Sequence, residues 1–372
     1  MERSQAARSC SPVTALLAVL LAAAGCGPVH KAGQSAPVAD RYLVYEKVIG
    51  EKGIWIAEAD GSRPRLVALD GHSPVVSPDG KWVVYSGDCA ERNNPTCDST
   101  YLVSTAAEKP HRLPHGISGT VEWSPDSKRI VGGGFSGDDL VSIDVARGTE
   151  VELAKGKFWG WSLSPDGKQI VFARLDDPNG EPVLGTKVNL FVTRLDGGEA
   201  KRITDTGDAA EPVWGPKSIA FSKLISCLPP TTQETLDGCR NNTWGRHEIW
   251  RVQPDGTDRT NITGSLAARF QMQGCVGLAP IDWSEDGRAL LGAWRCEFSA
   301  EPVAVDPETG ASRHLGWGSD TVALSADGQF ALVQSGTGAE TADEDQQVLI
   351  YSLGGGNPKV VAHGAVSPTW NR

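Results

Sequence analysis

A short phrase that recurs along the chain limits its possible folds more than its composition does. Six copies begin at positions 76, 123, 163, 214, 283 and 324, and the first of them reads VSPDGKWVVYSG. The intervals between the copies are 47, 40, 51, 69 and 41 residues. Recurrence at such a period is typical of architectures in which each copy is one supersecondary unit. The fold is therefore expected to be an array of similar units.

The letters of the phrase predict a β-hairpin. Pro presets the backbone for a turn, Asp bonds nearby main-chain amides, and Gly adopts the left-handed conformation that closes the turn. Apolar residues on both sides are typical of strands. A second pair of strands around a glycine turn follows several copies, as in NLFVTRLDGGEAKRIT from position 189 and EIWRVQPDGTDRTNIT from position 248. Each unit thus has four strands, and the shortest intervals match a β-propeller blade.

This pattern resembles the repeat of TolB-type propellers, the WD-like PDG-repeat β-propeller lipoproteins of the bacterial cell envelope. The resemblance rests on the PDG hairpins and on the strand pairs that follow them, and it extends over essentially all of residues 41–370. It implies a non-enzymatic protein that binds other molecules in the envelope. Propellers of this family often have six blades, whereas the copies in this chain favour seven.

The two ends of the chain predict how the seventh blade forms. Residues 42–69 supply strands two, three and four of a blade, at Tyr42–Lys47, Gly53–Glu58 and Arg65–Leu69, without a first strand. The C-terminal AVSPTW is a first strand alone. The expected fold is therefore all-β, a seven-bladed β-propeller closed by pairing of the C-terminal strand with the N-terminal blade. Closure would remove the exposed sheet edges that recruit other strands.

The N-terminus is typical of an exported protein. Arg3 and Arg8 precede an apolar run that ends in LAAAGC, and this run is too short for a permanent membrane span. LAAAGC resembles the lipobox of bacterial lipoproteins, which makes Cys26 the expected lipidated residue; plain secretion is the alternative. The predicted organisation is a signal peptide at 1–25, a lipid-anchored flexible tether at 26–40 and a propeller at 41–372. The protein is expected in the cell envelope, anchored by lipid and extracytoplasmic.

Apart from Cys10 in the predicted signal peptide and Cys26, the chain has six cysteines, which form three couples that are close in sequence. In an oxidising compartment an even number favours disulfides. The expected pairs are Cys89 with Cys97, Cys227 with Cys239, and Cys275 with Cys296. Free or metal-bound cysteine is the alternative, although the chain has no C-x-x-C motif.

The net charge of the chain limits the kinds of binding partner that are expected. The formal net charge is −11 at pH 7. Such a surface repels phosphate backbones, so nucleic acid is not expected as a partner, and the membrane is expected to be reached through the lipid anchor alone. A monomeric protein that binds an envelope protein or a glycan is the expected case.

The lengths of the connections predict which face of the propeller binds. Turns between strands one and two and between strands three and four are short, whereas long insertions join strands two and three or successive blades. We call the side of the long insertions the looped face. Loops on a rigid scaffold concentrate binding residues, although neutral elaboration is the alternative. The candidate binding residues are Arg92, Asn94, Asp176, Asp177, Trp244, Arg246, His247, Arg269 and Phe270.

Signals of catalysis are weak. His111 and His115 are four positions apart, but the two prolines around them forbid the helix that would bring both to one metal. The acidic cluster at 340–345 lacks the spacing of a calcium loop, and no G-x-S-x-G motif occurs. No metal, cofactor or catalytic residue is therefore expected. The alternative is an enzyme that acts on polysaccharide, similar to propeller uronate lyases, with His and carboxylate ligands around a metal near the central channel.

Overall fold

A computed structural model describes residues 42–69, 71–87, 99–106, 108–113, 116–134, 138–180, 187–226, 246–264, 275–296, 300–316, 318, 322–336 and 343–371. The elements in chain order are β1 (Tyr42–Lys47), β2 (Gly53–Glu58), β3 (Arg65–Ala68), β4 (His72–Val76), β5 (Trp82–Ser86), β6 (Thr100–Ser104), β7 (His111–Arg112), β8 (Ile117–Trp123), β9 (Arg129–Gly134), β10 (Asp139–Asp144), β11 (Glu150–Lys155), β12 (Phe158–Leu163), β13 (Gln169–Leu175), β14 (Val188–Arg194), β15 (Lys201–Arg202), β16 (Ala209–Trp214), β17 (Ile219–Ser226), β18 (Arg246–Val252), β19 (Thr260–Asn261), β20 (Cys275–Trp283), β21 (Leu290–Cys296), β22 (Ala300–Val305), β23 (Ser312–His314), β24 (Val322–Leu324), β25 (Phe330–Ser335), a 3-10 turn η1 (Asp343–Asp345), β26 (Gln347–Ser352), β27 (Lys359–His363) and β28 (Ala365–Trp370).

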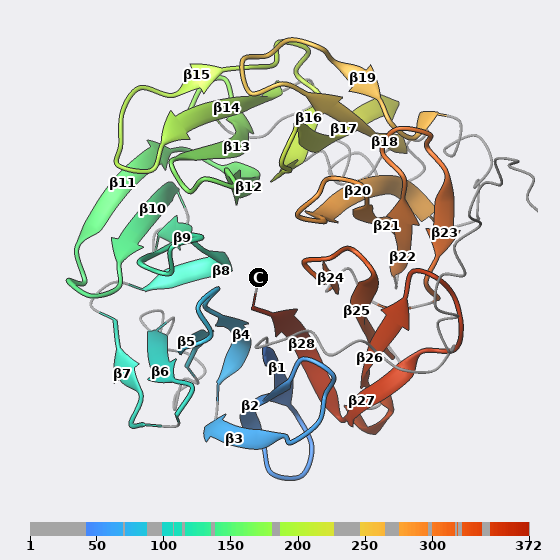
Figure 1. The fold of residues 1–372 in the computed structure, drawn as a ribbon. Coiled ribbons are helices and arrows are strands. Elements are labelled where there is room, and N and C mark those ends of the chain that lie inside the picture. The colour runs from blue at the N-terminus through green and yellow to red at the C-terminus, as the bar shows by residue number, and fades with distance from the viewer. Residues whose placement is uncertain are drawn as a thin grey trace, which may run out of the picture. The chain divides into compact units, whose positions relative to one another are not determined.

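The strands form antiparallel sheets in groups of four, which confirms the expected all-β architecture. Five sheets have four strands each: β4-β5-β6-β7, β11-β10-β9-β8, β12-β13-β14-β15, β24-β25-β26-β27 and β28-β1-β2-β3. A sixth sheet has eight strands, from β16 to β23. Within the compact unit Pro37–Arg372, the sheets follow one another around a centre with strands such as β4, β8, β12 and β28 innermost (Figure 1).

The eight-stranded sheet consists of two antiparallel groups joined at one point. β16 to β19 form one group and β20 to β23 form the other. A single parallel pair, His247 with Gly277, connects β18 to β20. A Cβ atom added at Gly277 would lie 2.8 Å from the Cβ and the Nδ1 of His247, so the bare backbone at this glycine makes the approach possible.

The repeated turns are closed by the residues that the sequence pattern singled out. In the first turn the Ser77 hydroxyl donates to the Asp79 carboxylate at 2.7 Å and accepts the Trp82 N–H at 3.0 Å. Gly80 completes the turn with φ of 69°. Ser124, Ser164, Ser284 and Ser325 repeat both hydrogen bonds in their own turns.

Hydrogen bonds in these turns lower the pKa of several aspartates. At Asp166 the Ser164 hydroxyl is the main cause and the Lys168 N–H adds to it. At Asp286 the Arg288 N–H comes first and the Ser284 hydroxyl second. The carboxylates are therefore structural parts of the turns, in agreement with the local chemistry of the motif.

One sheet combines the two ends of the described chain. β28 pairs with β1 antiparallel, with Leu43 opposite Trp370 and Lys47 opposite Ala365. Asn371 follows β28 and exchanges hydrogen bonds with Tyr42: its N–H donates to the Tyr42 carbonyl at 3.1 Å, and its Oδ1 accepts the Tyr42 N–H. This sheet, β28-β1-β2-β3, is called the composite sheet below.

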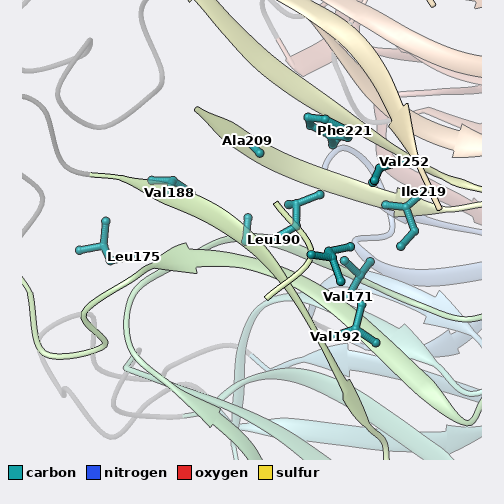
Figure 2. Close-up of a cluster of buried hydrophobic side chains, with 11 residues drawn as sticks. Val171, Leu175, Val188, Leu190, Val192, Ala209, Ile219, Phe221 and Val252 are labelled. Carbon is teal, nitrogen blue, oxygen red and sulfur yellow. The ribbon is translucent and has the colours of Figure 1, made fainter. Parts of the chain in front are cut away.

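The hydrophobic core lies between neighbouring sheets. Figure 2 shows one cluster in which Val171 and Val192 of one sheet pack against Ile219 and Phe221 of the next. Phe221 is 2% exposed. A second cluster includes Leu43, Ala365 and Trp370 of the composite sheet together with Leu332 of β25. Burial on both sides explains why these strands are apolar on both faces.

Candidate binding site

A cavity of about 600 Å³ lies at the centre of the unit, at the ends of the innermost strands. Residues from β4, β8, β12, β16, β20 and β28 line it, together with prolines of the turns that follow those strands. It therefore opens on the side of the short turns, which we call the short-turn face. Five of its lining residues are tryptophans: Trp123, Trp161, Trp214, Trp283 and Trp370. Sequence reasoning did not predict this site.

Three of the tryptophans are fixed by hydrogen bonds across or within sheets. The indole N–H of Trp123 donates to the Val75 carbonyl and that of Trp283 to the Val213 carbonyl, both at 3.1 Å. The indole of Trp370 donates to the Ala59 carbonyl at 3.1 Å. These three side chains are 6%, 6% and 8% exposed. They serve mainly as packing between sheets.

In three inner strands, β8, β12 and β20, the residue before the repeated Trp position links the strand to the next sheet. Both carboxylate oxygens of Glu122 lie 3.0 Å from the Leu163 nitrogen, whose N–H they accept. Oδ2 of Asp282 accepts the Leu324 N–H at 2.8 Å, and the Ser162 hydroxyl oxygen accepts the Trp214 N–H at 3.1 Å. A sequence signal was present, since an acidic residue directly precedes the tryptophan in VEW and in IDW.

The starts of the inner strands lie on the opposite side, at the looped face. Ser73, Glu211 and Ser367 occupy equivalent positions before a proline, and each has φ of 51°. A non-glycine residue in this conformation is strained and is held by its surroundings. The N–H of Ser367 donates to Oε1 of Gln334 at 2.9 Å, and the N–H of Ser73 donates to Oε2 of Glu46 at 3.4 Å. The composite sheet is thereby bonded to the sheet on each side of it.

Most of the predicted binding residues lie outside the described residues. This applies to Arg92, Asn94, Trp244, Arg269 and Phe270 of the binding set, to Cys89, Cys97, Cys227 and Cys239, and to Cys26 with the predicted signal peptide and tether. The long insertions do join strands two and three, or successive groups of strands, as the element order requires. Among the described residues no helix has the length and apolar character needed to span a membrane.

Four predicted binding residues are described, and they differ in accessibility. Asp177 is exposed in a turn, where its carboxylate accepts the Asn179 N–H at 2.9 Å. Asp176 accepts from the side chains of Asn189 and Arg202. Arg246 pairs with Glu248 at 3.3 Å, and His247 is 6% exposed beside Gly277. Asp177 and Arg246 therefore offer charge at the looped face, whereas His247 packs inside the sheet.

Cys275 and Cys296 lie opposite each other in the register of β20 and β21. Directly opposed residues of an antiparallel pair have Cα atoms about 4.5–5.5 Å apart, within the range that a disulfide spans. The backbone therefore suits the predicted pair.

Two histidines lie beside a carboxylate in the described part of the chain. His72 Nδ1 lies 2.7 Å from Glu46 Oε1 at the looped face, and His314 Nδ1 lies 3.3 Å from Glu301 Oε2. No group of three His, Cys, Asp or Glu side chains is placed to hold a metal ion in the described ranges. His111 packs edge-on against Trp82, and His115 lies outside the described residues.

Comparisons with known proteins support the fold. No protein-family model matches the chain. Dipeptidyl-peptidase 5 of Porphyromonas endodontalis is 28% identical over 145 residues, which are 38% of this chain and only 17% of that protein. The structure of oligogalacturonate lyase from Vibrio parahaemolyticus has a TM-score of 0.56 and 14% identity over 87% of this chain and 84% of its own.

TolB from Acinetobacter baumannii is a weaker structural match, with a TM-score of 0.49 and 18% identity over 89% of this chain and 66% of its own. A similarity this weak does not establish a relationship between the two proteins. The likeness to oligogalacturonate lyase, at 14% identity, concerns the fold alone. Combined with the antiparallel sheets of four strands around a common centre, it supports a β-propeller fold for this chain.

Proposed function

We propose that this protein is a non-enzymatic, lipid-anchored, extracytoplasmic propeller that binds a protein or glycan partner through its looped face. The observation that carries the proposal is the contrast between the two faces. Turns of the short-turn face are closed by their own Ser and Asp side chains, as at Ser77 and Asp79. The looped face presents exposed Asp177 and the charged pair Arg246–Glu248 at the ends of the long insertions.

The proposed scaffold is a seven-bladed ring closed by β28. The five four-stranded sheets and the two halves of the eight-stranded sheet would supply the seven blades. Pairing of Leu43 with Trp370 and of Lys47 with Ala365 supports closure through the composite sheet. A closed ring would hold the looped-face segments at fixed separations, which suits recognition of a folded partner.

Disulfides are proposed to brace that face, in the pairs Cys89–Cys97, Cys227–Cys239 and Cys275–Cys296. For Cys275 and Cys296 the strand register supports the pairing. A disulfide that closes the loop from Cys275 to Cys296 stabilises a fold by roughly 3 kcal/mol in the loop-entropy model. Peptide mapping of unreduced protein by mass spectrometry should find the three linked peptides, and free thiols at these positions would contradict the proposal.

Photochemical cross-linking tests the proposed face. A photoreactive amino acid at Asp177 reports on the looped face, and one at Asp255, in the exposed turn before Thr257, is the matched control on the short-turn face. Irradiation in intact cells of the source organism should give a discrete adduct from the Asp177 variant and none from the control. Equal adducts from both positions, or none from either, would contradict recognition through the looped face.

The alternative is an enzyme that acts on acidic polysaccharide, as the name of the oligogalacturonate lyase match suggests. The contact between His72 and Glu46 at the looped face is the observation that favours it. Incubation with oligogalacturonate and manganese should then produce an unsaturated product that absorbs in the ultraviolet, and His72→Ala should abolish that absorbance. The proposed binding function predicts no such product from either protein.

A further inference from the structure

A second cavity, of about 470 Å³, lies between two neighbouring sheets on the short-turn face, and we call it the side pocket. Trp82, Leu102 and His111 line it from the sheet β4-β5-β6-β7. Two short turns of the sheet β11-β10-β9-β8, at residues 127–128 and 144–147, complete it. Its volume is within the range of sites for small molecules. The function proposed above makes no use of it.

The inner wall of the side pocket is apolar. Trp82 and Val145 are partly exposed, and they pack in one hydrophobic cluster with Leu102, which is 1% exposed. The exposed ring of His111 packs edge to face with Trp82, with the ring centroids 6.1 Å apart. A partly exposed indole in such a cluster offers apolar surface that the body of a ligand can cover.

The rim of the side pocket has hydrogen-bond donors to spare. Among the described lining residues the carboxylate is that of Asp144, and it already accepts the Arg147 N–H and the Nη1–H of the same residue at 2.8 and 2.9 Å. The guanidinium of Arg147 has further donors, and this side chain is 76% exposed. Lys128 is equally exposed, and its Nζ lies 3.5 Å from the exposed Asp126, a weak pair in water. The rim can therefore take an acceptor.

The equivalent gap one sheet further along has a different wall. Arg129 stands there in the place of Trp82, because each residue donates its N–H to the serine five positions earlier in its turn. That gap, of about 500 Å³, is also lined by Lys168, the counterpart of Lys128, but its described lining includes no aromatic residue. The combination of an aromatic wall with a basic rim thus distinguishes the side pocket, and the second gap provides a matched control.

We propose that the side pocket binds a small organic acid, with its apolar body on Trp82 and its carboxylate at Lys128 and Arg147. Charge-assisted hydrogen bonds from the two cations would hold the carboxylate. A sugar fits less well, because its hydroxyls need acceptors and the Asp144 carboxylate is already bonded. A polyanion would be repelled by the net charge of −11. The side pocket lies apart from the looped face, so failure of recognition there leaves this inference intact.

Calorimetric titration of the whole mature protein with 3-phenylpropionate, an acid with an aromatic body, tests the proposal. The expected result is saturable binding that weakens as salt is added. The neutral amide 3-phenylpropionamide and the acid propionate, which has no ring, should each bind roughly tenfold more weakly. The double variant Lys128→Gln, Arg147→Gln should lose roughly tenfold in affinity, whereas Lys168→Gln in the equivalent gap should match the wild type.

Nuclear magnetic resonance of the tryptophan side chains locates the bound acid. The indole N–H signal that is missing from Trp82→Phe should be the one that shifts most during the titration of the wild type. Lys128 and Arg147 are exposed, so their variants should fold. Binding of the amide as tight as that of the acid would overturn the proposal. So would no binding up to about 10 mM acid, unchanged affinity in the double variant, or a larger shift at another indole signal.

Discussion

The hairpin of β4 and β5 and the junction of β28 with β1 make the same hydrogen bonds in different ways. In the hairpin, Ser77 accepts the N–H of Trp82, five residues further along. At the junction, Asn371 accepts the N–H of Tyr42, although 329 residues separate the two in sequence. The main-chain hydrogen bonds also correspond, since the Ser77 N–H donates to the Trp82 carbonyl and the Asn371 N–H donates to the Tyr42 carbonyl. Asn371 thus takes the place of the turn serine.

The difference lies in the entropy of closing the loop. Bringing the ends of a loop of n residues together has an entropic free-energy cost of about (3/2)RT ln n. Closing a loop of 329 residues rather than one of five therefore costs roughly 4 kcal/mol more. Packing must offset this, and Leu43, Ala365 and Trp370 are all buried in one cluster at the composite sheet. If the proposed ring is closed by the composite sheet, loss of this sheet should open the ring, whereas loss of a turn hairpin should disturb one sheet only.

The largest effect is expected at the buried tryptophans. Trp370→Ala should lower the free energy of unfolding by about 3–5 kcal/mol, because a large side chain is removed from a packed cluster. It should also expose the amides of β28 to hydrogen exchange. Trp123→Ala, at the equivalent position in a continuous hairpin, should cost a similar amount and leave β28 protected. Equal protection of β28 in both variants would contradict the special role of the composite sheet.

A smaller effect is expected at the turn positions. Asn371→Ala removes the acceptor for the Tyr42 N–H and the donor to the Pro78 carbonyl, and should cost about 1–3 kcal/mol in chemical denaturation. Ser77→Ala is the matched control, and it should cost about 1 kcal/mol because the covalent turn still holds the strands together. A larger loss of unfolding free energy in Ser77→Ala than in Asn371→Ala would contradict this expectation.

The smallest effect is expected on acidification. The pKa of Asp166 and that of Asp286 are lowered by turn hydrogen bonds, so their contribution is complete above the unfolded pKa of about 3.9 and is lost as pH falls through the folded pKa. The protection factors of the turn amides Lys168 and Arg288 against hydrogen exchange, measured relative to the intrinsic rate at each pH, should therefore fall below about pH 4. The Tyr42 amide, bonded to the non-titrating amide of Asn371, should change less, and Asp166→Asn should remove the effect at Lys168.

Local chemistry explains why sequence reasoning found the hairpins. Ser77, Asp79 and Gly80 act within one turn, so their roles can be inferred from neighbouring letters. The pairing of β28 with β1 required counting strands in each unit, which the repeat allowed.

Features set by contacts between sheets were not predictable in this way. Ser73 and Ser367 adopt a positive φ before proline against their local preference, because neighbouring sheets bond their amides. Glu122 and Asp282 line a cavity that exists only once six inner strands meet. His247, predicted as a binding residue of the looped face, has a side chain that is only 6% exposed, because β18 and β20 approach each other at Gly277.

A cross-link between the two ends of the chain tests the central claim most directly. Lys47 and Ala365 are opposed in the register, next to the hydrogen bond from the Val48 N–H to the Gly364 carbonyl. The double variant Lys47→Cys, Ala365→Cys should form a disulfide that peptide mapping detects, whereas Lys47→Cys with Val366→Cys should not, since residue 366 points to the other side of the sheet. Free thiols at 47 and 365 in folded protein, or equal linkage of both pairs, would contradict a ring closed by the composite sheet.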